Sequence, residues 1–305
     1  MNGLLIVGSG AMACLFGATL ARHTEVTLLG TWEPGIREIR EHGIRVETRE
    51  GPDVVRVEAT TDPSQLSRFQ YALVLVKSWQ TESATARLST VLAEDGLALT
   101  LQNGLGNLET LQRTIGPERA ALGVTTAGAT LLGPGRVRPG GQGEIYLPKR
   151  GQLEELRSLF ERADFEVKMA DDLEGLVWSK LAVNAGINPL TALLRVRNGA
   201  LVDNADAREV LEAAVEEVAM VVDAAGGKMA WEDPVTQTLN VARRTAENRS
   251  SMLQDIERGA PTEIDAICGA VVRRGEKLGV GTPVNRTLWK LVRAAASEEA
   301  DVDHN

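Results

Sequence analysis

The chain has 305 residues, of which 43% are hydrophobic and 25% charged, and its formal net charge is −9. Domains usually hold about 100–200 residues, so this length predicts two domains with separate cores. Net negative charge disfavours nucleic-acid binding, and no apolar run approaches the ~20 residues of a membrane span. Neither nucleic acid nor a membrane is therefore expected as a partner.

Few residues of this chain suit metal or thiol chemistry, because it contains 3 histidines and 2 cysteines. This scarcity argues against a His/Cys zinc site, a disulfide framework or a Cys–His dyad, so no metal is expected. If the protein is an enzyme, its acid–base chemistry falls to Lys, Tyr, Asp or Glu. The isolated Cys14 and Cys268, and the lack of a basic segment before the first predicted strand, indicate a cytoplasmic protein.

The first half of the chain alternates short apolar runs with segments of helical spacing. Strands are predicted at 4–7, 25–29, 71–76 and 97–101, with a helix at 12–22. The run YALVLV at 71–76 is apolar throughout, which is typical of a strand covered on both faces. This alternation predicts an α/β fold, a doubly wound parallel sheet with crossover helices.

A glycine-rich turn follows the first predicted strand and opens the first predicted helix. Its pattern is G-x-G-x-x-A, formed by Gly8, Ser9, Gly10, Ala11, Met12 and Ala13. In this context the first glycine permits a tight turn, the second allows a pyrophosphate to approach, and the small Ala13 packs the helix onto the strand. The turn predicts dinucleotide binding; the plainer alternative is an ordinary tight strand–helix turn.

The end of the second predicted strand bears on the choice of nicotinamide cofactor. NAD sites usually have Asp or Glu there, whereas NADP sites tend to have Arg or Lys. Here Thr31 follows Gly30, so no acid repels a 2′-phosphate and no arginine binds it. Glu33 could serve an NAD ribose, and Lys77 could reach a phosphate from the strand at 71–76. We favour NADP (NADPH) and do not exclude NAD.

A polar stripe runs along a predicted helix near residues 176–190. Lys180, Asn184 and Asn188 recur at intervals of four, and each step of four advances only ~40° around a helix. Their neighbours are Leu, Ala, Val and Ile, so the stripe indicates a polar cleft, and Pro189 is expected to break or kink the helix. Lys180 is the best candidate to donate a proton to a ketone oxygen; the alternative is a lysine that merely extends to solvent.

The remaining helices of the second half are predicted at 207–225, 262–278 and 283–297. The first ends at Gly226, a good C-cap signal, and its apolar face could pack within the subunit or against a partner, which allows a homodimer. The second is expected to begin at Thr262 as N-cap, with Asp265 completing an imperfect capping box.

A second polar constellation lies at residues 248–265. Ser250 and Ser251 could donate hydrogen bonds to a substrate carboxylate. Glu263 could accept one from a substrate hydroxyl or from a cofactor ribose, or it could simply favour the start of a helix.

Taken together, five motifs of the chain resemble those of the ketopantoate reductase (2-dehydropantoate 2-reductase) family. They are GSGAMA at 8–13, VLVKSWQT at 74–81, LQNGLGN at 101–107, KLAVNAGINPLTAL at 180–193 and SSMLQDIERGAPTEID at 250–265. The resemblance covers both halves. It implies an N-terminal Rossmann domain at 1–170, an all-helical substrate and catalytic domain at 171–305, and an active site in the cleft between them. The implied reaction is reduction of the ketone of 2-dehydropantoate by NADPH, on the pathway to pantothenate.

The resemblance also assigns roles to matching residues. Lys180 is implied as the proton donor, and Glu263 as the glutamate that contacts substrate or cofactor. Lys77 and Asn103 are implied to lie where cofactor and substrate meet. The substrate site is implied to be lined by Asn184, Asn188, Asn198 and Ser251.

This chain departs from the family pattern at three places. Thr31 stands where many members have arginine, Ala13 replaces the third glycine, and residues 125–128 lack a histidine that some members carry. Two alternatives stay open: a paralogous reductase acting on another 2-oxo acid, and a non-catalytic module that senses NADP(H). The second would need a DNA- or partner-binding segment, and it gives the Lys/Asn/Asn stripe no purpose.

Overall fold

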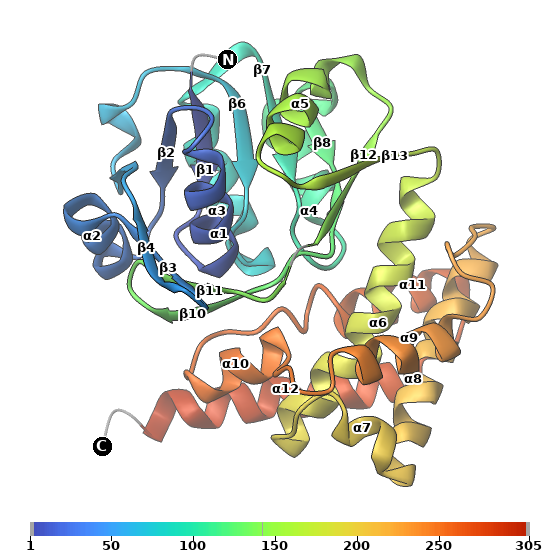
Figure 1. Cartoon of the computed structure of the whole chain (residues 1–305). Coiled ribbons are helices and arrows are strands. Elements are labelled where there is room, and N and C mark those ends of the chain that lie inside the picture. The colour runs from blue at the N-terminus through green and yellow to red at the C-terminus, as the bar shows by residue number, and fades with distance from the viewer. Residues whose placement is uncertain (1–2, 142, 303–305) are drawn as a thin grey trace. The chain divides into compact units, whose positions relative to one another are not determined.

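The computed structural model describes residues 3–141 and 143–302, and the chain divides into two compact units (Figure 1). One unit comprises Met1–Gln102 and Asn107–Leu173, and the other comprises Asn103–Gly106 and Glu174–Asn305. The first unit is α/β and the described part of the second is helical. The short segment Asn103–Gly106 thus belongs to the second unit, although its flanking residues belong to the first.

A six-stranded parallel sheet in the order β5-β2-β1-β6-β7-β8 forms the centre of the first unit. The strand order reverses at β1, which is the topological switch point where α/β sheets bind ligands. This sheet confirms the predicted doubly wound parallel fold. Its strands are β1 (Leu4–Val7), β2 (Val26–Leu29), β5 (Glu58–Thr60), β6 (Phe69–Val74), β7 (Leu92–Thr100) and β8 (Ala120–Leu122).

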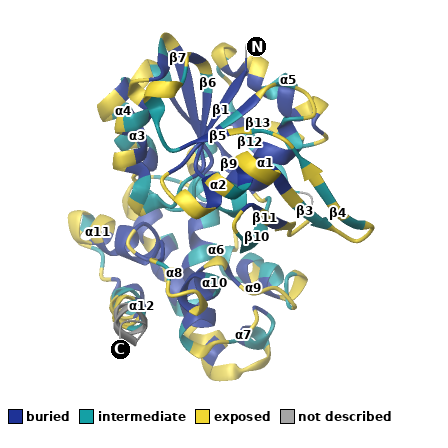
Figure 2. Cartoon of the chain, turned by 90° about the vertical axis from the view of Figure 1, so that its left-hand side faces the viewer, coloured by how far each residue is buried: buried dark blue, intermediate teal, exposed yellow. Residues whose placement is uncertain are grey.

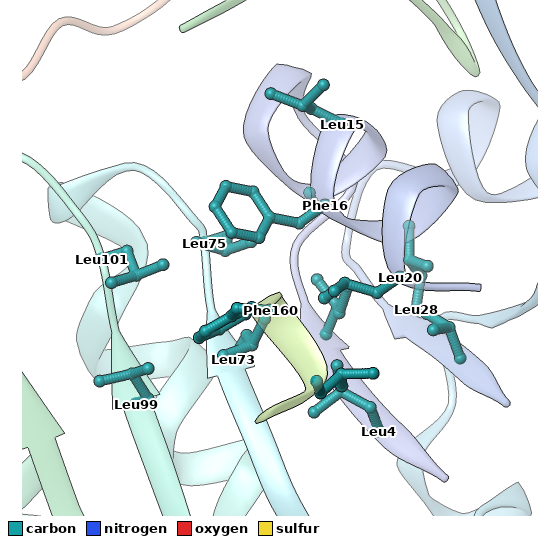
Figure 3. Packing of buried hydrophobic residues seen from close by; sticks show 14 of the residues in the cluster. Leu4, Leu15, Phe16, Leu20, Leu28, Leu73, Leu75, Leu99, Leu101 and Phe160 are labelled. Carbon is teal, nitrogen blue, oxygen red and sulfur yellow. The ribbon is translucent and has the colours of Figure 1, made fainter. Parts of the chain in front are cut away.

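Helices cover both faces of this sheet because alternate strand residues point to opposite sides. Leu4 and Ile6 pack with one set of helices, and Leu5 and Val7 with another. Figure 3 shows the first set, where Phe16 and Phe160 approach leucines of the strands. The first set consists of α1 (Ala11–Leu20), α2 (Glu33–His42) and α5 (Glu154–Arg162), and the second of α3 (Thr81–Ser89) and α4 (Asn107–Ile115).

Two smaller sheets extend the first unit. One has the order β10-β11-β3-β4 and the other β13-β12-β9. They consist of β3 (Ile44–Thr48), β4 (Gly51–Val55), β9 (Val124–Thr125), β10 (Ala129–Gly133), β11 (Arg136–Pro139), β12 (Glu144–Pro148) and β13 (Glu166–Ala170).

The second unit is built from helices around its own core, and Figure 2 shows their buried faces in dark blue. The helix predicted at 207–225 is α8 (Ala205–Ala224), whose apolar face is buried within this unit. No helix in the described ranges is long and apolar enough to cross a membrane. The other helices are α6 (Leu173–Leu194), α7 (Ala200–Asp203), α9 (Pro234–Arg244), α10 (Ser251–Glu257), α11 (Cys268–Leu278) and α12 (Pro283–Val302).

The structure differs from the sequence expectation at the start of one helix and, for Pro189, excludes a break while the alternative of a kink stays a prediction. The helix predicted from Thr262 begins instead at Cys268, because residues 264–267 form a turn whose Ala266 carbonyl accepts the Leu105 N–H. Pro189 does not end α6, which continues to Leu194. A proline ring removes one N–H donor from the ladder, and the residues beyond it still form helix here.

Candidate active site

The glycine-rich loop at residues 8–13, which we call the phosphate loop after its predicted role, has a backbone geometry that fits a dinucleotide. Gly8 has φ +135°, and a Cβ there would lie 3.1 Å from the Leu75 carbonyl oxygen and 3.3 Å from the Ala13 Cβ. At Gly10, by contrast, a Cβ would meet no atom within 4 Å. Gly10 is the N-cap of α1 and provides no side-chain cap. The open backbone and uncapped helix N-terminus fit a pyrophosphate, and Ser9, Ala11 and Met12 complete the loop.

The end of β2 presents exposed side chains next to this loop. Thr31, Trp32 and Glu33 are all exposed, and Glu33 is the first residue of α2. Arg87 on α3 donates to the Gly30 carbonyl at 3.1 Å and also to the Thr61 carbonyl. Sequence reasoning missed Arg87, because nothing in its local sequence points to a strand end so far along the chain. Its guanidinium fixes the backbone that Thr31 follows.

Lys77 begins a short turn just after β6. Its N–H lies 3.3 Å from Gln80 Oε1, and the Gln80 N–H donates to the Lys77 carbonyl at 2.9 Å. Because β6 is the neighbour of β1, Lys77 follows the strand beside the phosphate loop. The turn holds the backbone of Lys77 in place while its side chain is partly exposed.

A hydrogen-bonded clamp holds the two ends of the segment Asn103–Gly106, which we call the tongue. The buried hydroxyl of Thr81 accepts from Gln102 Nε2 at 2.9 Å and donates to Asn107 Oδ1 at 2.8 Å. Gln102 Nε2 also donates to the Val76 carbonyl at 2.8 Å. Sequence reasoning missed Thr81 and Gln102, although both are polar residues placed close after strands, which is the signal that could have found them.

The tongue itself packs on the turn that contains Glu263. Asn103 Nδ2 donates to Glu263 Oε2 at 3.3 Å, and the Leu105 N–H donates to the Ala266 carbonyl at 3.0 Å. Gly104 has φ +82°, and a Cβ there would lie 2.6 Å from the Ala266 Cβ. Glycine is therefore required at 104, and the close approach brings Asn103 and Glu263 together.

Lys180 lies on α6, on the same unit as Glu263. Burial lowers the pKa of its ammonium to about 8, and the negative charge of Glu263 opposes that shift. Glu263 is 5% exposed. An amine whose pKa lies near neutral pH is well suited to give and regain a proton. The carboxylate that acts on its charge, Glu263, also accepts the hydrogen bond from Asn103.

The two asparagines of the stripe also lie on α6. Asn188 is buried, and the Nδ2 of Asn184 is buried with no hydrogen-bond partner within the described residues. A buried amide N–H without an acceptor costs free energy unless a ligand or water satisfies it. The Asn184 amide therefore fits a site that receives a polar ligand.

Backbone hydrogen bonds bring Asn198 beside the segment that leads into α10. The Asn198 N–H donates to the Asn248 carbonyl at 3.1 Å, and the Gly199 N–H to the Ala246 carbonyl at 3.1 Å. Asn198 Nδ2 donates to Thr245 Oγ1 at 2.9 Å, while its buried Oδ1 has no partner among the described residues.

The two serines before α10 differ in their surroundings. Ser250 is the N-cap, accepting from the Leu253 N–H at 3.1 Å and from Thr191 Oγ1 at 2.7 Å. Ser251, the first helical residue, is exposed. Ser250 thus stabilises the local structure, and Ser251 is the serine that remains accessible. Within the described ranges, no group of three or more His, Cys, Asp or Glu side chains suits a metal ion.

Family models match both units of the chain. The model described as "Ketopantoate reductase PanE/ApbA" matches residues 4–152, and the model "Ketopantoate reductase PanE/ApbA C terminal" matches residues 172–296.

Named relatives extend the match over nearly the full length. A 2-dehydropantoate 2-reductase of Halobacterium salinarum is 38% identical over 299 residues, covering 96% of this chain and 98% of its own. One of Archaeoglobus fulgidus is 36% identical over 298 residues, covering 96% and 97%.

Solved structures share the architecture. A PanE/ApbA family ketopantoate reductase from Ralstonia eutropha matches with TM-score 0.90 and 33% identity, covering 98% of this chain and 99% of its own. D-mandelate dehydrogenase, solved with NADH and anilino(oxo)acetate, matches with TM-score 0.92 and 25% identity at the same coverage. With both units matched and near-full-length relatives above 30% identity, this chain belongs to the ketopantoate reductase family.

Proposed function

We propose that this protein reduces the ketone of 2-dehydropantoate to (R)-pantoate with NADPH. The observation that carries the proposal is Lys180, whose pKa of about 8 suits a proton donor, on the same unit as the hydrogen-bonded pair Asn103–Glu263. The names of the near-full-length relatives support the choice of substrate.

Residues 1–170 would bind the dinucleotide. Its pyrophosphate would lie on the open backbone at Gly10, and Thr31 would be next to the adenosine end. Lys77 would lie where cofactor and substrate meet. The nicotinamide supplies a hydride when it is bound. Thr31 carries no charge that repels a 2′-phosphate, which supports NADPH; the NADH in related structures keeps NADH as the alternative.

Residues 171–305 would bind the substrate and move the proton. Ser251 would lie near the carboxylate, and Asn184, Asn188 and Asn198 would line the rest of the substrate site. As the C2 carbonyl carbon gains the hydride, the Lys180 ammonium would transfer its proton to the developing alkoxide. The neutral amine then regains a proton from water, and Glu263 would keep the ammonium form favoured.

The direct test follows oxidation of NADPH with 2-dehydropantoate as substrate. Lys180→Ala is expected to lower kcat by about 10²–10⁴-fold, the usual contribution of a positioned general acid. Lys290→Ala, which removes an exposed lysine of α12, is the matched control and should keep the wild-type rate. An unchanged rate in Lys180→Ala would remove Lys180 from the mechanism.

A second candidate keeps the reaction and changes the substrate to another 2-oxo acid. The observation that favours it is the fold match to D-mandelate dehydrogenase at TM-score 0.92. The two candidate substrates are distinguished by comparing reduction rates for 2-dehydropantoate and for the 2-oxo acid that corresponds to mandelate, each measured with NADPH and with NADH. Assembly as a homodimer also stays a prediction, which sedimentation velocity would test.

A further inference from the structure

A tryptophan stands exposed at the carboxyl edge of the central sheet. Trp32, the N-cap of α2, is 39% exposed. Among the described residues of the first unit, the other large apolar side chains with high exposure are Val54 and Trp79. Single exposed apolar side chains are common on protein surfaces, so exposure alone assigns no role to Trp32. Its place beside a predicted ligand site is what matters, because an aromatic ring buries a large area when a ligand covers it.

The Trp32 ring is held in place by the helix that follows it. A Cβ on Gly35 would lie 2.2 Å from Trp32 Cε3 and 2.7 Å from its Cζ3, so the ring lies directly on the glycine backbone. Gly35 is buried, and Pro34 stiffens the chain between the two residues. One part of the ring is therefore packed while the rest stays accessible, which is the form of a preorganised platform.

The platform is joined to the phosphate loop through the backbone. A Cβ on Gly30 would lie 2.9 Å from Ser9 Oγ, and the Gly8 N–H donates to the Leu29 carbonyl at 2.8 Å. The end of β2 is thus in contact with the loop, and Trp32 follows Gly30 by two residues. In such folds the ribose of the adenosine half lies at this strand end, so the next group of the ligand outward is the base.

We propose that Trp32 is the stacking platform for the adenine base of the nicotinamide cofactor. This inference rests on the proposed function for the identity of the ligand. Stacking of a base on an aromatic ring requires no charge on the protein. Thr31 itself carries no charge, and the nearby Glu33 is a candidate for the ribose and not for the base. Adenine is common to NADPH and NADH, so Trp32 would contribute equally to both affinities.

The test measures equilibrium dissociation constants by calorimetry for the full-length protein and its Trp32→Ala and Trp32→Phe variants. The ligands are NADPH, NADH and ADP-ribose, with reduced nicotinamide mononucleotide as the ligand that lacks adenine. Trp32→Ala should weaken binding of the three adenine ligands about tenfold to hundredfold and leave the mononucleotide unchanged. Trp32→Phe should retain most of the affinity, because it keeps an aromatic face.

Three results would overturn the inference. The first is an unchanged NADPH dissociation constant in Trp32→Ala. The second is an equal loss of mononucleotide affinity, which would mean that the substitution disturbs the whole unit. The third is a loss of adenine-ligand affinity in Trp79→Ala that Trp32→Ala does not show. A different result would contradict the proposed function and not this inference. In that case the wild-type protein would bind NADPH in a Trp32-dependent way but would reduce no 2-oxo acid.

Discussion

At the scale of single residues, the protonation of Lys180 sets the expected pH range of the enzyme. The pKa of a lysine is ordinarily near 10.5, and burial lowers that of Lys180 to about 8. Ketone reduction needs the protonated form, so kcat/KM should be level below about pH 8 and fall about tenfold per pH unit above it. A pH profile of NADPH oxidation measures this.

The control for that profile is the reverse reaction, in which Lys180 must accept a proton, so alcohol oxidation should rise up to about pH 8. Glu263→Gln removes the negative charge that raises the Lys180 pKa, so the inflection should move to lower pH. A profile in both directions without an inflection near pH 8 would contradict the assignment.

Gly10 offers a substitution that separates binding from folding. Its φ of −82° suits any residue, and a Cβ there meets no protein atom within 4 Å. Gly10→Ala should therefore leave the free energy of unfolding within about 0.5 kcal/mol of wild type. The added methyl group would lie where the pyrophosphate is expected to bind, so NADPH binding should weaken at least tenfold.

Gly8→Ala is the matched contrast, since Gly8 has φ +135° and a Cβ 3.1 Å from the Leu75 carbonyl oxygen. Urea unfolding and NADPH titration of both variants distinguish the two roles. An equal loss of stability in Gly8→Ala and Gly10→Ala would show that the folded state also requires glycine at position 10.

At the scale of elements, Thr81 joins the two residues that flank the tongue in sequence. Its hydroxyl bonds to Gln102 and Asn107, the residues on either side of the tongue. Thr81→Val keeps the shape and removes one hydrogen bond from each of the two amides, at a cost of about 1–3 kcal/mol. Because Asn103 is the first residue of the tongue, kcat should fall as well.

Urea unfolding and steady-state kinetics test this, with Thr81→Ser as the variant that restores the hydroxyl and should recover both quantities. Loss of stability with an unchanged kcat would show that the clamp does not position Asn103.

At the scale of the whole molecule, the two units have separate hydrophobic cores. A ligand that binds only the folded state stabilises it by mass action. At one hundred times its dissociation constant, NADPH should raise the free energy of unfolding by about 2.7 kcal/mol. Thermal unfolding with and without NADPH checks this, and Gly10→Ala should show a much smaller rise. An equal rise in that variant would place the binding energy elsewhere.

Local sequence was enough to predict the parallel sheet, because strand and helix periodicities and the G-x-G-x-x-A turn are properties of neighbouring residues. It also predicted α8 to within two residues at its start. The positions of Lys180, Asn184 and Asn188 on one helix followed from the interval of four. Their roles, like those of Asn198 and Ser251, stay predictions that the proposed experiments test.

Only the tertiary structure decided the contacts between residues distant in the chain. The helix expected from Thr262 begins at Cys268, since the turn before it bonds to the tongue. Asn103 reaches Glu263 across 160 positions, and Thr81 joins Gln102 and Asn107. Periodicity records which face of an element is buried, but it carries no record of which distant backbone group satisfies each buried polar atom. The motifs therefore predicted which residues form the candidate site. Long-range hydrogen bonds, which only the tertiary structure shows, hold Asn103 beside Glu263.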